Sequence, residues 1–202
     1  MTTVKLVGKK VKRPENGGRR LVITDIHGCA KTFNRLLETV ALKDDDQLFL
    51  LGDFINRGKR SKQVIDKVLG LMEDGHAVYP LMGNHEETVL HILAENPSEL
   101  QSLLKSRKSL NLLNKKGLVK KRFVRFFRSL PYYYQLDEFF LVHAGFNMKI
   151  EKPLTDKHAM CWVRNFNLKK PYKGRTVLYG HTPKKISKIE KAIRNNASSI
   201  CL

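Results

Sequence analysis

Five short segments carry acidic, amide and imidazole side chains at the ends of predicted strands. Their side chains include two aspartates, the amide of Asn84, four imidazoles and one arginine, a set that can hold two metal ions and leave one imidazole free. No single segment is diagnostic, but the five in this order point to a dinuclear site. The segments are Asp25-Ile26-His27-Gly28, Gly52-Asp53-Phe54-Ile55-Asn56-Arg57-Gly58, Gly83-Asn84-His85-Glu86, His143-Ala144-Gly145 and Gly180-His181-Thr182.

The side-chain types in these segments suit transition metals. Asp25 and His27 are two residues apart, so on a strand that continues straight both point to one side. Asp53 has two oxygens and can bridge two cations. A neutral oxygen and two further imidazoles complete the predicted set, from Asn84, His143 and His181. Mixed oxygen and nitrogen ligands favour manganese first, with iron or zinc as alternatives, over calcium or magnesium. Two such ions, about 3.5–4 Å apart, favour in-line displacement at a phosphate.

Each residue alone has a simpler explanation. A single histidine at a strand end is more often a hydrogen-bonded structural residue, and an aspartate there is more often a turn or helix cap. Asn84 after Gly83 could serve only to tolerate a left-handed turn. Dismissing the site requires all of these explanations at once, so we favour the metal site.

The elements that must position these residues follow from the apolar pattern. Short apolar runs predict strands at residues 20–24, 48–51 and 77–82, and apolar residues at helical spacing predict helices at 31–42 and 61–72. This alternation predicts a parallel α/β core. In such a core the reactive groups lie at the carboxyl ends of the strands, which is where the segments fall.

The second half predicts a helical region followed by strands. Residues 85–130 read as helical, and residues 118–130 mix phenylalanines with lysines and arginines. An amphipathic helix packed on the core is the favoured account of that stretch, and contact with nucleic acid or a partner is the alternative. Strands are predicted at residues 132–136, 139–142 and 176–179. With no repeat or linker, we expect a single domain over residues 19–202 after a basic arm, residues 1–18.

The net charge and the cysteine content limit the expected binding partners and the expected cellular compartment. The 202 residues include 38 Lys+Arg and 19 Asp+Glu, a net charge of +19. Such a surface attracts nucleic acid, acidic proteins or phosphorylated ligands, although a compositional bias explains it equally well. The odd number of cysteines, without a CxxC pair, favours a reduced protein. With no signal-like or membrane-length apolar run, we expect a cytoplasmic protein without a membrane partner.

The five segments resemble the motifs of the calcineurin-like metallophosphoesterases, which read GDxHG, GDxxDRG, GNHE, HAG and GHT. Within them the chain looks most like the phosphoprotein phosphatase branch, especially small bacterial and phage-type serine/threonine phosphatases, which are related to symmetrical dinucleoside tetraphosphatases. The match runs from Arg20 to Pro183. It implies an α/β fold, a four-layer αββα sandwich with two mixed sheets, and a metal site at the carboxyl edge of the strands.

The resemblance also implies a role for each position. Asp25, His27, Asp53 and His181 would hold one ion, and Asn84 and His143 would join a bridging Asp53 at the second. His85 would be the free imidazole that protonates the leaving alcohol. Arg57 would clamp the phosphate, with Asn84 and His85 also touching it. Arg164, in Cys161-Trp162-Val163-Arg164, would be the second clamp, although a structural tryptophan with a surface arginine fits that segment equally well.

Two positions depart from the family pattern. Thr24 replaces the glycine before the first aspartate, which leaves the ligands intact. Asn56 replaces the second aspartate of GDxxDRG, the carboxylate that orients the GNHE histidine and stabilises its protonated form. We expect the Asn56 oxygen to accept a hydrogen bond from His85 but not to supply the negative charge.

The leading hypothesis is a metal-dependent phosphomonoesterase for phosphoserine or phosphothreonine, acting by direct attack of a hydroxide that bridges the ions. Symmetrical hydrolysis of dinucleoside polyphosphates is the first alternative, although the sequence shows no clear base-stacking pocket. A nucleic-acid phosphodiesterase is the second, favoured by the charge of +19. A non-catalytic binding protein that decayed at Asn56 is the third, and survival of all six presumed ligands argues against it. The sequence leaves the oligomeric state open.

Overall fold

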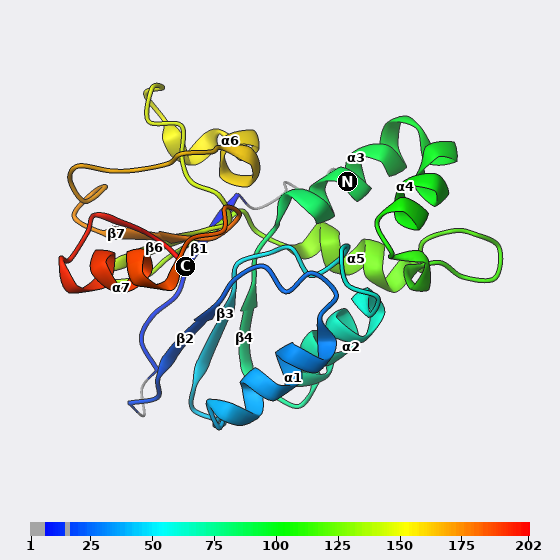
Figure 1. Ribbon diagram of the computed structural model, residues 1–202, viewed down its shortest axis with the longest axis horizontal. Helices are drawn as coiled ribbons and strands as arrows, with labels where there is room; N and C mark the ends of the chain where they lie inside the picture. Colours follow the sequence, from blue (N-terminus) through cyan, green and yellow to red (C-terminus); the bar gives the residue numbers. More distant parts are fainter. Residues whose placement is uncertain (1–6, 15–16) are drawn as a thin grey trace.

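The computed structural model describes residues 7–14 and 17–202 as two β-sheets with helices around them (Figure 1). One sheet has five strands in the order β1-β5-β6-β7-β8, and the other has three in the order β2-β3-β4. The strands are β1 (Gly8–Lys10), β2 (Arg20–Ile23), β3 (Gln47–Leu50), β4 (Ala77–Pro80), β5 (Tyr133–Gln135), β6 (Phe139–Val142), β7 (Thr176–Tyr179) and β8 (Ser199–Cys201). The expected α/β fold with two sheets is confirmed. The larger sheet is mixed, through its antiparallel β5–β6 pair, whereas the smaller one is parallel throughout.

Successive side chains of β3 belong to two different apolar clusters, which shows how the sheets and the helices pack together. Phe49 belongs to a core cluster between the sheets, where its ring meets that of Tyr134 edge-on with centroids 5.8 Å apart. Leu48 and Leu50 instead belong to the main cluster, which contains the apolar residues of the neighbouring helices. Because both faces of β3 are covered by apolar side chains, residues 48–51 form an unbroken apolar run.

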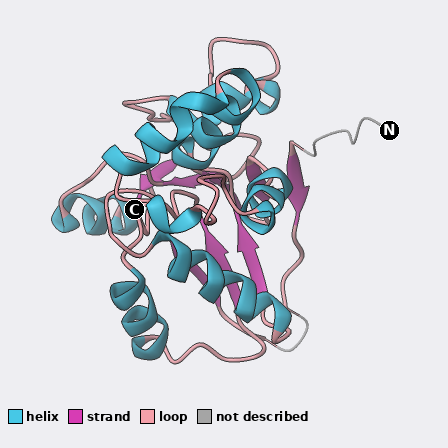
Figure 2. Cartoon of the chain, turned by 90° about the vertical axis from the view of Figure 1, so that its right-hand side faces the viewer, coloured by secondary structure: helices cyan, strands magenta, loops and turns pink. Residues whose placement is uncertain are grey.

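Helices flank the sheets. In Figure 1, α1 and α2 lie beside the three-stranded sheet, and α6 and α7 lie on the side of the five-stranded sheet. In Figure 2 several of the helices stand in front of the strands. The helices are α1 (Ala30–Thr39), α2 (Ser61–Glu73), α3 (Asn84–Glu95), α4 (Leu100–Ser106), α5 (Lys121–Ser129), α6 (Lys157–Trp162) and α7 (Ile186–Arg194), with short 3-10 turns η1 (Pro97–Glu99), η2 (Leu110–Leu112) and η3 (Pro153–Thr155).

The predicted helical region, residues 85–130, is divided into α3, α4 and α5 by the turns η1 and η2. Its last part packs on the core, as the favoured account expected. Phe123, Phe126 and Phe127 of α5 are buried, and the Phe126 ring meets Phe54 from the loop after β3 with centroids 5.5 Å apart. This contact ties the helical region to the strand ends.

The predicted arm, residues 1–18, is only partly described. Its described part contains β1, which pairs in parallel with β5 and places Gly8 opposite Tyr133. This segment of the expected arm is therefore a strand of the domain. Over the described ranges, no helix has the length and apolar character needed to cross a membrane.

Candidate active site

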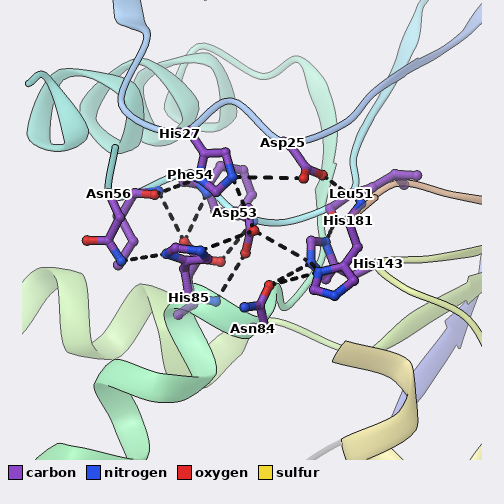
Figure 3. A network of polar contacts seen from close by, with 12 residues as sticks. Asp25, His27, Leu51, Asp53, Phe54, Asn56, Asn84, His85, His143 and His181 are labelled. Atoms are coloured by element: carbon purple, nitrogen blue, oxygen red, sulfur yellow. Dashed lines mark hydrogen bonds and ion pairs between the residues drawn. The ribbon is translucent and has the colours of Figure 1, made fainter. Parts of the chain in front are cut away.

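Side chains from five loops converge at the carboxyl ends of the strands (Figure 3). Asp25 and His27 follow β2, Asp53 follows β3, and Asn84 and His85 begin α3 just after β4. His143 and His181 follow β6 and β7 of the other sheet. The structure thus brings all six predicted ligands and His85 together. Both sheets are needed, since neither alone supplies the full set.

Asp53 lies at the centre of the cluster. Its Oδ2 is 3.5 Å from Nε2 of His27, 3.6 Å from Nε2 of His143 and 3.8 Å from Nε2 of His85. Its other oxygen, Oδ1, accepts the backbone N–H of His85 at 3.1 Å. In Figure 3, Asp53 stands between His27 and His85 on one side and His143 and His181 on the other. This central position suits a carboxylate that bridges two ions.

Two imidazoles are oriented by backbone carbonyls. Nδ1 of His143 lies 2.7 Å from the oxygen of Leu51, and Nδ1 of His27 lies 3.0 Å from the oxygen of Ile55. A carbonyl can only accept, so Nδ1 carries the proton in both rings and Nε2 presents a lone pair to the cluster. Such outer hydrogen bonds fix the tautomer that a metal-binding histidine needs.

The donor set fits divalent cations. Asn84 Oδ1 lies 3.0 Å from Nε2 of His143 and 3.2 Å from Nδ1 of His181, so electron-pair donors face one another. Burial lowers the pKa of His181, and the neighbouring His143 adds to the shift, which favours the neutral form of the ring. Nε2 of His27 is buried without a hydrogen-bond partner. Lone pairs converging on a carboxylate are the arrangement that a cation satisfies.

The loops around the cluster hold unusual backbone conformations. His27, Asp53, Asn56, Arg57 and His181 all have left-handed φ values, between 46° and 72°. Strain of this kind persists only where surrounding contacts determine it, and it is typical of functional sites.

Glu86 supplies such contacts and was missed as a site residue in the sequence. It is completely buried, and its carboxylate accepts the backbone N–H groups of Asp53, Phe54 and Ile55 at 2.9, 2.9 and 3.2 Å. Burial raises the pKa of Glu86 and the nearby Asp53 adds to the shift, while the three backbone N–H groups act in the opposite direction. Its position directly after His85 in a recognised motif was the available signal.

Two motif glycines allow close approach of the loops. A Cβ atom on Gly83 would lie 2.3 Å from Oδ1 of Asp53, and one on Gly180 would lie 2.7 Å from Oδ1 of Asp25. That same Asp25 oxygen accepts the backbone N–H of His181 at 3.1 Å, which ties the two sheets together at the site.

The contact between Asn56 and His85 differs from the expectation. The amide nitrogen of Asn56, rather than its oxygen, faces Nδ1 of His85 at 2.7 Å, and Oδ1 of Asn56 has no partner. The amide donates, so Nδ1 of His85 accepts and Nε2 carries the ring proton. Ser61 and Ser109, which the sequence did not single out, hold Asn56 by accepting its backbone N–H at 3.0 Å each.

A cavity of about 290 Å³ opens beside His85. Arg57 and Arg164, the two residues predicted to clamp a phosphate, line it, and Arg107 from the loop after α4 is a third arginine that sequence reasoning missed. The Arg107 carbonyl accepts the backbone N–H of Arg57 at 3.0 Å, which places the two residues side by side. Burial lowers the pKa of His85 to about 4, and the charges of Arg57 and Arg107 contribute in the same direction.

Comparison with known proteins gives a consistent result. The sequence profile of the family "Calcineurin-like phosphoesterase" matches residues 18–198. The chain is 27% identical to the asymmetrical bis(5'-nucleosyl)-tetraphosphatase PrpE of Bacillus cereus strain AH820, over 81% of this chain and 78% of that protein. A shorter match, 42% identical, links it to the symmetrical bis(5'-nucleosyl)-tetraphosphatase of Acidovorax ebreus strain TPSY, over 36% of this chain and 24% of that protein.

A solved structure supports the fold. The serine/threonine phosphatase from Saccharomyces cerevisiae, with similarity to human PP5, superposes with a TM-score of 0.58 at 15% identity. The superposition covers 89% of this chain, which spans 65% of the length of the yeast chain. At this identity the likeness concerns the fold alone.

Proposed function

Because the chain belongs to the calcineurin-like phosphoesterases, we propose that it hydrolyses phosphate groups with two divalent ions and prefers substrates with more than one phosphate, such as dinucleoside polyphosphates. The observation that carries the substrate class is the set of three arginines, Arg57, Arg107 and Arg164, around the cavity that His85 also lines. Two arginine side chains can bind the oxygens of one phosphate through paired hydrogen bonds, and a third arginine can bind a neighbouring phosphate of the same substrate.

Asp25, His27, Asp53 and His181 are the residues we assign to the first ion, and Asn84 and His143 join Asp53 at the second. When bound, the ions supply charge to stabilise the transferring phosphate and a hydroxide for in-line attack. Their identity is a separate proposal, in which manganese comes first because the ligands mix carboxylate, amide and imidazole.

The remaining groups orient the substrate and stabilise the leaving oxygen. Arg57 and Arg164 bind the oxygens of the reacting phosphate, and Arg107 binds the next phosphate. His85 lines the cavity and carries its ring proton on Nε2, which lies 3.8 Å from Oδ2 of Asp53. We assign this N–H group to a hydrogen bond with the leaving oxygen, which stabilises the negative charge that develops there as the P–O bond breaks.

Phosphoserine or phosphothreonine is the second candidate substrate. The pair Arg57 and Arg164 beside His85 supports it, because one phosphate and its leaving alcohol need no further cation. A dinucleoside polyphosphate and a phosphopeptide therefore differ in their need for Arg107.

Parallel hydrolysis assays test the proposal. The manganese-supplied protein is given diadenosine tetraphosphate, a phosphoserine peptide and single-stranded DNA, and kcat/KM is measured for each. We expect diadenosine tetraphosphate to be preferred. Replacing Arg107 with alanine should lower kcat/KM roughly tenfold for diadenosine tetraphosphate, the size of one charged hydrogen bond lost, and less for the peptide. Arg128→Ala on α5, which removes an exposed charge outside the cavity, is the matched control.

The other outcomes assign the site differently. A preference for the peptide, with equal losses from Arg107→Ala on both substrates, favours the second candidate. Preferred hydrolysis of DNA, with binding that weakens steeply as salt rises, indicates a nucleic-acid phosphodiesterase that uses the basic surface. Hydrolysis of none of them by metal-loaded protein overturns the proposal.

A further inference from the structure

We propose that Trp162 and His158 of α6, together with Glu87 of α3, form a platform that binds a purine base of the substrate. The inference rests on the proposed function, since it names the group that lies beyond the phosphates. It provides the base-stacking pocket that was not recognisable in the sequence.

The two rings of the platform are nearly parallel and accessible. His158 and Trp162 lie one turn apart on α6, with ring centroids 6.0 Å apart and planes inclined by 17°. Trp162 is 37% exposed, whereas the residues between them, Ala159, Met160 and Cys161, are buried and anchor the helix. An aromatic face held by a buried helix turn and open to solvent is suited to stacking on a base.

The indole is held in place by a hydrogen bond. Its Nε1–H donates to Oε2 of Glu87 at 2.6 Å, which joins α6 to the first turn of α3. α3 begins at Asn84 and His85, so the platform is attached to the same helix that carries two residues of the site. Thr88, the next residue on α3, donates its hydroxyl to the Asn84 carbonyl at 2.7 Å.

The platform is continuous with the phosphate cavity. A second cavity of about 570 Å³ is lined by Glu87, Thr88, His91, His158 and Trp162. Trp162 and Thr88 also line the cavity that holds Arg57, Arg107 and Arg164. A molecule whose phosphates occupy the arginines would therefore place its next group against the indole.

The negative charge of Glu87 determines which chemical group the platform can bind. Three arginines line the phosphate cavity, while the second cavity is lined by the carboxylate of Glu87, which accepts the indole N–H of Trp162. A carboxylate repels a further phosphate or an acidic peptide, and it accepts the N–H groups that a purine presents at its edge. The occupant that fits both cavities is a nucleotide with its phosphates on the arginines and its purine on Trp162.

The chain provides a direct optical test, because Trp162 is its single tryptophan. The protein loaded with Zn²⁺, a closed-shell ion, is titrated with AMP and with ribose 5-phosphate, which differ only in the base. We expect AMP to quench the indole emission, with a half-saturating concentration at least tenfold below that of any change caused by ribose 5-phosphate. Equal effects of the two ligands, or no quench by AMP, would overturn the platform.

Kinetics of variants give a second readout. Trp162→Ala should lower the ratio of kcat/KM for diadenosine tetraphosphate to kcat/KM for a phosphoserine peptide without aromatic residues by roughly tenfold, the typical loss of one base stack. Trp162→Phe, which keeps a ring, should restore most of that ratio. Leu118→Ala, which shortens another exposed apolar side chain, is the matched control.

The outcomes separate this inference from the proposed function. If the wild type hydrolyses neither substrate, the proposed function fails, and the AMP titration still decides the platform. If both substrates are hydrolysed and Trp162→Ala leaves their ratio unchanged, the proposed function stands and the platform is wrong. If Trp162→Ala leaves kcat/KM for diadenosine tetraphosphate unchanged and lowers kcat/KM only for peptides that carry an aromatic residue beside the phosphoserine, the platform binds a peptide side chain, and the purine assignment is overturned.

Discussion

The amide nitrogen of Asn56 lies 2.7 Å from Nδ1 of His85. The contact orients the imidazole as a carboxylate would, but it donates a proton where a carboxylate accepts one. His85 is therefore held as a neutral ring with its proton on Nε2, and no negative charge at Asn56 favours a second proton. The substitution at this position changes the proton chemistry of the site while keeping its geometry.

Asn56→Asp should raise turnover most for substrates with poor leaving groups. A carboxylate at this position would accept from Nδ1 and stabilise the imidazolium, which makes His85 a better proton donor to an alcohol. We expect kcat on a phosphoserine peptide to rise several-fold and kcat on p-nitrophenyl phosphate to change little, because a nitrophenolate needs little protonation. Asn196→Asp, at an exposed asparagine that also has a positive φ of 46°, is the control. Unchanged turnover of the peptide would contradict this account.

Metal content should distinguish His85 from the ligands. His27, Asp53 and His85 offer atoms within 4.8 Å of one another, as do Asp53, His143 and His181, so distance alone also admits His85 as a ligand. We expect His85→Ala to retain two metal equivalents by elemental analysis while kcat falls at least a hundredfold, the usual loss when one hydrogen-bond donor to the developing negative charge is removed. Asp53→Asn should lose both equivalents, because it removes the bridging carboxylate. Loss of one equivalent from His85→Ala would make His85 a ligand.

Glu86→Gln should weaken both the fold and the site. The carboxylate accepts three backbone N–H groups from the loop after β3, and glutamine turns one acceptor oxygen into a donor that faces them. We expect the free energy of unfolding to fall by roughly 1–3 kcal/mol, the cost of leaving buried donors unpaired, and the affinity for metal to fall with it. Urea unfolding and metal titration measure the two effects. Glu95→Gln, at the exposed end of the same helix, should change neither.

Asp46 should make the fold sensitive to acid. Its side chain is 1% exposed, and Arg19 donates to its two oxygens at 3.0 and 2.6 Å. The Arg19 guanidinium holds the pKa of the Asp46 carboxyl well below its usual range. Because its pKa is depressed in the folded state, the ionised Asp46 carboxylate stabilises the fold at pH values above the ordinary carboxyl pKa of about 4. This contribution is lost as the pH falls below that value.

The corresponding variant is Asp46→Asn. We expect the wild type to have the larger free energy of unfolding at pH 6, and the difference between the two proteins to shrink as the pH falls toward 3. Asp74→Asn, at an exposed carboxylate after α2, should follow the wild type at every pH. A difference that does not vary with pH would mean that Asp46 acts through its shape and not its charge.

The parallel core could be predicted because its signals are local. The apolar runs of β2, β3 and β4, each followed by a polar motif, identify strands and the edge at which they end. By contrast, β1 is the three-residue segment Gly-Lys-Lys, which carries no strand pattern of its own. It becomes a strand because β5 offers an open edge 125 residues further along the chain, and that pairing depends on the folded sheet.

The sequence by itself determined which residues can bind metal and the order in which strands deliver them, because residue type and strand ends are local properties. The tertiary structure decided the direction of each ring nitrogen, the donor that Asn56 presents to His85, and the anchoring of a whole loop by Glu86. It also decided that Arg107 and Trp162 share one cavity with Arg57. These relationships join side chains from separate loops and both sheets, so they exist only once the sheets have packed together.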